Sequence, residues 1–174
     1  LNGNSREIEA ALQEHRIDLG LVEGISRLPN LKYTTFLQDE LVAVVHTGNK
    51  LSLPDEITPE DLSRIPLVLR ERGSGTLDVF ERALSGHNIK LSSLNVLLYL
   101  GSTESIKLFL EHTDCMGIVS IRSISRELLS GTFRVIEIKG MPMLREFCFA
   151  QPQGQESGLS QVLMQFAMHH NKKL

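Results

Sequence analysis

The stretch that decides the fold is LRERGSGTLDVFERAL, residues 69–84. It joins an apolar run, PLVL (66–69), to a turn of small residues, GSGT (73–76), and then to apolar residues at helical spacing. The apolar positions of the helical part are Leu77, Phe80, Ala83 and Leu84. This pattern predicts a strand, a turn and a helix, with Gly86 just beyond the helix as a C′ residue.

The GSGT turn has two interpretations. Two glycines let a backbone adopt positive φ and approach a ligand closely, and the first turn of a helix has unpaired N–H groups that suit an anion. Alternatively, Ser74 or Thr76 simply caps the helix. The turn is neither a Walker A loop nor a Gly-x-Gly-x-x-Gly fingerprint. The local sequence leaves both interpretations open.

The composition is that of a globular domain. The chain has 174 residues, of which 41% are hydrophobic and 22% charged, which allows one domain or two small lobes. A net charge of −3 and only 5% aromatic residues argue against nucleic-acid binding by this chain itself. Its apolar runs are far shorter than the ~20 residues of a membrane span, and no signal peptide is visible. We therefore expect no membrane contact.

Cysteine and histidine suggest neither a disulfide framework nor a metal site. The two cysteines, Cys115 and Cys148, lie in apolar surroundings, which favours a reducing cytoplasm. His112 and Cys115 have a metal-like spacing, but no second pair lies nearby and structural zinc takes four ligands. We expect no metal and no other cofactor.

Strands and helices alternate along the chain. Strands are predicted at 18–24, 41–46, 66–71, 94–100, 116–120, 133–138 and 145–151. Besides the helix after the GSGT turn, helices are predicted after Asn4, at 57–62, after 101–103, at 123–128 and at 157–171. Asn4 with Glu7 fits a capping box, and Thr58 with Pro59 fits a helix start. The last helix has an apolar face made of Leu159, Val162, Leu163, Phe166 and Ala167.

This alternation predicts an α/β fold with largely parallel sheets. Two strand–turn–helix joints have a similar signature, GSGT (73–76) and GST (101–103). Ligands of open α/β sheets sit at the carboxyl ends of strands, so the two joints could converge on one pocket.

The order of motifs resembles the effector-binding domain of LysR-type transcriptional regulators. The motifs are GNSREI, DLGLVEG, DELVAVV, ITPEDL, PLVLRERGSGT, LGSTESIK and GIVS, and they are collinear with the family over residues 2–150. The RERGSGT turn is most similar to regulators of sulfur or carbon assimilation. The resemblance implies a two-lobed fold like type 2 periplasmic binding proteins, each lobe a mostly parallel sheet flanked by helices.

The resemblance also implies the domain organisation. Lobe I would comprise residues 1–42 and 147–174, and lobe II residues 43–146. The strands at 41–46 and 145–149 would be the two crossovers, and a small effector would bind in the cleft between the lobes.

Nine residues match effector-site positions of the family. They are Ser74, Gly75, Thr76, Ser102, Thr103, Glu23, Gly24, Ser120 and Arg122. Ser74 and Thr76 would donate hydroxyls to an anionic effector, and Arg122 would pair with a carboxylate or phosphate. A plain N-cap role for Ser102 is equally compatible with the sequence.

The resemblance implies partners as well. Family members pair side by side, so we expect a homodimer, and a tetramer for the full-length protein. The family's domain begins with a strand and a helix upstream of GNSREI, and its winged helix-turn-helix lies further upstream. We therefore expect this chain to be a fragment that contacts DNA only through a domain it lacks, and effector affinity to be impaired.

The sequence leaves two other functions to consider. One is a periplasmic solute-binding protein of the same fold, against which the GNSREI and RERGSGT motifs argue. The other is an enzyme, but Ser74, Ser102 and Ser120 have no evident His–Asp partners. Glu71 and Asp78 could be an acid–base pair, yet fit a strand-end charge and a first-turn acid better. We expect no enzymatic activity.

Overall fold

The computed structural model describes residues 1–23, 27–154 and 157–171. The chain divides into two compact units, which are described separately. Unit 1 comprises Leu1–Gln38, Gly73–Gly75 and Arg145–Leu174, and unit 2 comprises Asp39–Arg72 and Thr76–Leu144. Strands β2 (Leu31–His46) and β8 (Met143–Pro152) contribute residues to both units.

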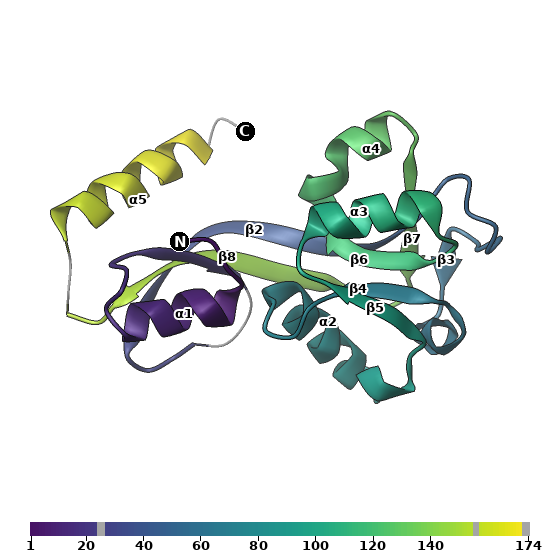
Figure 1. Ribbon diagram of the computed structural model, residues 1–174, viewed down its shortest axis with the longest axis horizontal. Coiled ribbons are helices and arrows are strands. Elements are labelled where there is room, and N and C mark those ends of the chain that lie inside the picture. Colours follow the sequence, from purple (N-terminus) through teal and green to yellow (C-terminus); the bar gives the residue numbers. More distant parts are fainter. Residues whose placement is uncertain (24–26, 155–156, 172–174) are drawn as a thin grey trace. The chain divides into compact units, whose positions relative to one another are not determined.

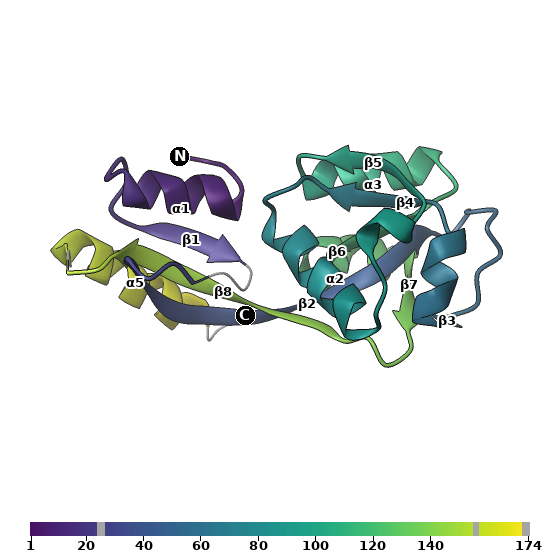
Figure 2. The ribbon, with the colours of Figure 1, turned by 90° about the horizontal axis from the view of Figure 1, so that it is seen from below.

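Unit 1 is built on helix α1 (Ser5–Gln13) and strand β1 (Gly20–Glu23). Asn4 caps α1, and its reciprocal hydrogen bonds with Glu7 form the capping box that the sequence predicts. Strand β1 pairs antiparallel with β8, which in turn lies next to β2. Figure 2 shows α1 lying along β1. The buried cluster beneath α1 contains Ile8, Leu12, Val22, Leu31, Cys148 and Ala150.

Helix α5 (Gly158–Asn171) forms where the sequence predicts a closing helix. Its apolar face is exposed rather than buried: Leu159 is 81% exposed and Phe166 60%. The helical pattern therefore identified the helix and its apolar face but not a packing partner for that face.

Unit 2 contains the remaining strands and helices. The strands are β3 (Glu56–Ile57), β4 (Leu67–Arg70), β5 (Val96–Leu100), β6 (Met116–Ser120) and β7 (Phe133–Ile138). The α-helices are α2 (Gly75–Gly86), α3 (Thr103–His112) and α4 (Ser125–Leu129), and the 3-10 helices are η1 (Pro59–Arg64), η2 (Leu91–Ser93) and η3 (Ile121–Ile124). Figure 1 shows α3 and α4 on one side of the strands and α2 on the other.

The strand pairing in unit 2 is mixed. Strand β4 runs parallel to both β5 and β6, and β3 runs parallel to β7. Strand β2 runs antiparallel to both β6 and β7. The α/β class is as predicted, but the sheet is less uniformly parallel than expected. The difference arises at β2, because its first paired residue in unit 2, Leu41, lies opposite the last residue of β6, Ser120, so the two strands run in opposite directions.

Two element boundaries differ from the sequence expectation. Strand β2 begins at Leu31, ten residues before the apolar run that predicted it. The sequence did not predict this part of the strand because residues 32–38 are exposed or only partly buried and show no continuous apolar pattern. Gly86 is the last residue of α2 and not the residue after it. Thr58 and Pro59 start a helix as predicted, although that helix, η1, is of the 3-10 type.

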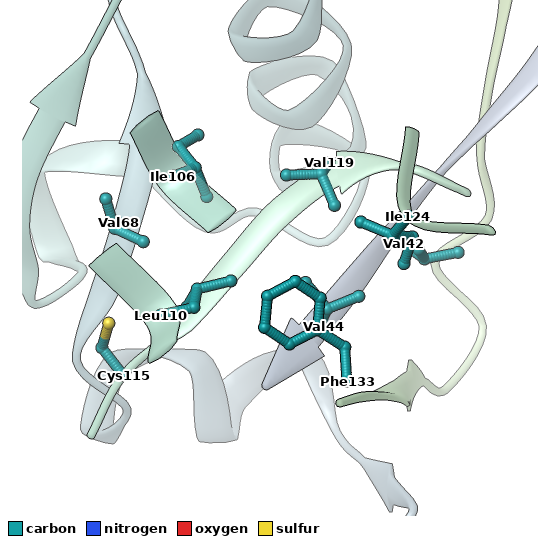
Figure 3. Packing of buried hydrophobic residues seen from close by; sticks show 9 residues of the cluster. All are labelled: Val42, Val44, Val68, Ile106, Leu110, Cys115, Val119, Ile124 and Phe133. Atoms are coloured by element: carbon teal, nitrogen blue, oxygen red, sulfur yellow. The ribbon is translucent and has the colours of Figure 1, made fainter. Parts of the chain in front are cut away.

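The core of unit 2 on the α3 side is shown in Figure 3. Ile106 and Leu110 of α3 pack onto a cluster that also contains Val42, Val44, Val68, Cys115, Val119, Ile124 and Phe133. Burial raises the pKa of the Cys115 thiol to about 11, so that it remains protonated at neutral pH. This cluster holds α3 in place over the strands that lead to the candidate site.

Candidate functional site

The carboxyl ends of β4, β5 and β6 meet at one edge of the sheet in unit 2. Arg70 at the end of β4 lies opposite Leu100 at the end of β5, and β6 runs in the same direction beside β4. Because α3 follows β5 and Ser120 ends β6, this edge gathers elements bearing several predicted site residues. Those that lie in unit 2 are Thr76, Ser102, Thr103, Ser120 and Arg122. The parallel pairing thus places the carboxyl ends of three strands that are far apart in sequence at one edge of the sheet.

Ser102 is the N-cap of α3. Its hydroxyl accepts a hydrogen bond from the Ser105 N–H at 3.1 Å and lies 2.8 Å from the Ser105 hydroxyl. The N-cap role of Ser102 therefore accounts for the hydrogen bonds that its hydroxyl forms. Thr103 is the first residue of α3, where backbone N–H groups lack partners within the helix and favour an anion.

Ser120 is engaged by a buried carboxylate. Its hydroxyl donates to Oδ1 of Asp39 at 2.9 Å and accepts from the Arg122 N–H at 3.2 Å. The Asp39 side chain is fully buried, and Nε of Arg122 lies 3.9 Å from the same Oδ1 atom. The Arg122 side chain is 59% exposed, so its other guanidinium nitrogens remain accessible to a solvent-borne anion.

Sequence reasoning missed Asp39. It lies on β2, and its partner Ser120 is 81 residues away. The only signal was an acidic residue directly before an uninterrupted buried run, DELVAVV, where a charge needs a partner.

In unit 1, the Gly73–Gly75 loop packs against β1 and the start of α1. A Cβ atom on Gly75 would lie 2.5 Å from the backbone oxygen of Glu23, and one on Gly73 would lie 3.2 Å from Cδ of Arg6. Gly73 also has a φ of +92°, which disfavours other residues. These contacts explain why both positions are occupied by glycine, because a side chain there would crowd neighbouring atoms of the protein itself. Ser74 and Thr76 are buried beside them.

Glu23 has structural partners within unit 1. Its carboxylate accepts a hydrogen bond from Arg145, whose side chain is only 4% exposed and whose guanidinium lies 4.7 Å from the centre of the Phe147 ring. The Ser5 hydroxyl donates to the Glu23 backbone oxygen at 2.7 Å and accepts from its N–H at 3.1 Å. Gly24, the next predicted site residue, lies outside the described residues.

Two further features bear on the function. Among residues 1–23, 27–154 and 157–171, no group of three potential His, Cys, Asp or Glu metal ligands occurs. Within that same part of the chain, no helix is long and apolar enough to cross a membrane.

Comparison with known proteins identifies the family of this chain. The family model of the LysR substrate binding domain matches residues 1–172. The HTH-type transcriptional regulator YeiE of Escherichia coli (strain K12) is 31% identical over 136 residues, which are 78% of this chain and 45% of YeiE. The chain spans about half the length of the curated relatives that it matches, with shares of 45%, 48% and 55%.

Two solved structures show the same fold. The CcmR regulatory domain of Synechocystis PCC6803, in complex with 2-PG, superposes with a TM-score of 0.83 at 24% identity, covering 98% of this chain and 81% of that one. The effector binding domain of QuiR, in complex with shikimate, gives a TM-score of 0.81 at 19% identity, covering 98% and 79%. The expected fold of periplasmic-binding-protein type is thereby confirmed.

Proposed function

This chain belongs to the LysR substrate-binding domain family, and we propose on that premise that it senses a small anionic metabolite for a bacterial transcriptional regulator. Effector binding would change how the longer, oligomeric protein binds DNA in the cytoplasm. The chain itself would catalyse no reaction and hold no cofactor. The alternative, a periplasmic solute-binding protein, shares the fold but is not favoured by the family match or by regulators such as YeiE.

The observation that carries the anionic preference is the edge of unit 2 where β4, β5 and β6 end. Helix α3 begins directly after β5, and the N-terminus of a helix favours negative charge. Arg122 adds an exposed guanidinium next to Ser120. A helix start and a cation at this edge suit a carboxylate or phosphate group better than a neutral or cationic one.

We assign the effector contacts at this edge to residues of different kinds. Thr76 and Thr103 would offer first-turn N–H groups, and Arg122 would form a charge-assisted hydrogen bond. Ser102 and Ser120 would act indirectly, because their hydroxyls already cap α3 and bind Asp39. Ser74 and Gly75 precede Thr76 and would hold the start of α2 in place.

An exposed apolar surface supports self-association. Strand β5 is at the end of the strand order in its sheet, and Leu97, Leu98 and Tyr99 on it are 47%, 42% and 40% exposed. Leu108 on the adjoining helix α3 is 62% exposed. An apolar edge strand beside an exposed apolar helix position is typical of a surface that a second subunit covers. We propose a homodimer through this surface, and a tetramer of the longer protein.

The test is a binding screen on this chain with 2-PG, shikimate, phosphate and sulfate, read by thermal unfolding and by isothermal titration calorimetry. A true effector at 100 times its Kd should stabilise the fold by about 2.7 kcal/mol. Arg122→Gln should weaken binding roughly tenfold or more, because it removes a charge-assisted hydrogen bond. Thr76→Ala should weaken it as well.

The matched control is Arg126→Gln, since Arg126 is an exposed arginine on the neighbouring helix α4. Its binding should equal that of the unaltered chain. An anion whose affinity is the same in the Arg122→Gln, Thr76→Ala and Arg126→Gln variants would place the site elsewhere. Absence of saturable binding by all four anions would contradict the anionic preference.

A further inference from the structure

Lys107 on α3 is a largely buried cation that contacts three different elements. Its side chain is 14% exposed, and its Nζ lies 2.6 Å from Oε1 of Glu127 on α4 and 3.1 Å from Oε2 of Glu104 in the first turn of α3. The same ammonium donates a hydrogen bond to the backbone oxygen of Ser123 in η3 at 3.2 Å. One side chain therefore links α3, η3 and α4 within unit 2.

The residue before Ser123 is Arg122, the exposed cation of the proposed effector site. We propose that Lys107 is a positioning residue of that site: it holds the η3 backbone against α3 and thereby fixes where the Arg122 guanidinium is presented to an anion. This inference rests on the proposed function, because it concerns the same ligand. Lys107 acts through Arg122 and needs no contact with the effector.

The backbone of Arg122 is also held by side chains on either side of it. The Ser120 hydroxyl donates to the buried Asp39 carboxylate at 2.9 Å and accepts from the Arg122 N–H at 3.2 Å. The Ser125 hydroxyl donates to the Arg122 backbone oxygen at 2.8 Å. These bonds attach η3 to β2 and to the start of α4, and Lys107 adds the attachment to α3.

Stability alone explains a lysine at this position poorly. Burying an ion pair costs desolvation, and apolar side chains of similar volume often stabilise a protein as well or better. Burial by itself would lower the pKa of Lys107, but hydrogen bonds to Glu127 and Glu104 outweigh it and raise the pKa, so the ammonium is charged at neutral pH. A charged donor can hold a backbone oxygen in one place, which an apolar side chain cannot. A cation held in advance in its binding geometry loses less conformational freedom when the anion binds.

The experiment measures anion affinity in a double-mutant cycle. Isothermal titration with 2-PG, shikimate, phosphate and sulfate compares the unaltered chain, Lys107→Met, Arg122→Gln and the double variant. Lys107→Met should weaken binding roughly threefold to tenfold when Arg122 is present, and less than about twofold when Arg122 is already replaced. An equal loss in both backgrounds would assign Lys107 to fold stability alone and overturn the proposal.

Hydrogen exchange gives a second measurement, which needs no ligand. The Arg122 amide donates to the Ser120 hydroxyl, so its exchange rate reports how firmly η3 is held. Lys107→Met should speed this exchange at least about fivefold relative to the amides of β6, whereas a global loss of stability would speed both equally. If Lys107→Met does not fold, Glu127→Gln takes its place. That variant loosens the same lysine without removing it and should change both measurements in the same direction, by less.

The matched control is Lys139→Met, which removes the same charge from a side chain that is 71% exposed and whose Nζ lies 3.9 Å from Glu56. Its anion affinity and its Arg122 exchange should equal those of the unaltered chain. If anions bind but Lys107→Met leaves both measurements unchanged, the positioning role is wrong and the anion-binding function stands. If no anion binds the unaltered chain but Lys107→Met still speeds Arg122 exchange, the anion-binding function is wrong while the hold of Lys107 on Arg122 stands.

Discussion

Arg145 on β8 and Glu23 on β1 form an ion pair although they lie 122 residues apart in sequence. The Arg145 side chain is 4% exposed and that of Glu23 18%. The pair links the carboxyl end of β1 to β8, next to the point where Glu23 lies opposite Phe147 in the strand pairing. It also sets the position of the Glu23 backbone, against which Gly75 packs.

Removing one partner of this pair should destabilise the fold. Arg145→Met leaves a largely buried carboxylate without its cation, and we expect a loss of about 3 kcal/mol in the free energy of unfolding. Urea unfolding measures it, and the double variant with Glu23→Gln should recover part of the loss. The control is Arg16→Met, which breaks the exposed Arg16–Glu14 pair, whose side chains are 53% and 60% exposed. It should change stability by less than about 1 kcal/mol. Equal effects of the two methionine variants would contradict this account.

Two glycines of α2 should respond differently to alanine. Gly75→Ala places a Cβ atom 2.5 Å from a backbone oxygen of Glu23, which cannot move as a flexible side chain would. We expect a loss of at least about 1 kcal/mol, as overpacking costs. Gly86→Ala meets nothing within 4 Å at the last residue of the helix. Because alanine favours the helical conformation, it should be neutral or slightly stabilising. Thermal unfolding of both variants is the measurement, and a stable Gly75→Ala protein would argue that the loop does not pack on β1.

Self-association should depend on the β5–α3 surface. Leu97→Lys and Leu108→Lys each put a charge on a surface that a second copy would cover, so they should shift the protein toward the monomer. Analytical ultracentrifugation over a concentration series checks this. The control is Leu129→Lys on α4, a residue that is 90% exposed and lies outside the surface. If all three variants associate like the unaltered chain, the homodimer proposal in this form is wrong.

Asp61 provides a prediction of pH dependence. Its carboxylate accepts hydrogen bonds from the Thr58 N–H at 2.9 Å and from the Thr58 hydroxyl at 2.8 Å, and these bonds lower the pKa of Asp61. A lowered pKa in the folded state means that the stabilisation is present above the unfolded value of 3.8 and is lost as the pH falls through the folded pKa. NMR titration of the Asp61 carboxyl carbon measures it. Thr58→Ala removes the hydroxyl donor but keeps the N–H, so it should raise the pKa part of the way towards 3.8. An unchanged pKa would show that the hydroxyl contributes nothing.

Local features of this protein were predictable from the sequence because their partners lie within three or four residues. The capping box of Asn4 and Glu7 and the helix start at Thr58–Pro59 are of this kind. The Ser102 cap was one of two interpretations, and its partner Ser105 is three residues away. The strand–turn–helix joint at residues 69–84 formed as predicted because its apolar spacing changes from a continuous run to a helical period.

The overall fold was predictable for a different reason: the order of motifs along the whole chain resembles one family, and the match over residues 1–172 bears this out. The mixed direction of the strands was not predicted from the apolar runs, since a run shows that a strand is buried but not which way its neighbours point. The functional residues assigned by resemblance stay predictions, because no bound effector tests them.

The sequence by itself determined most of the elements, the capping box of α1 and the family, since these depend on neighbouring residues or on the order of motifs. Only the tertiary structure decided which distant charges meet. It paired Asp39 with Ser120 and Glu23 with Arg145. The physical reason is that such contacts depend on strand order and register. A shift of one residue in register would turn each of these side chains to the other face of its sheet.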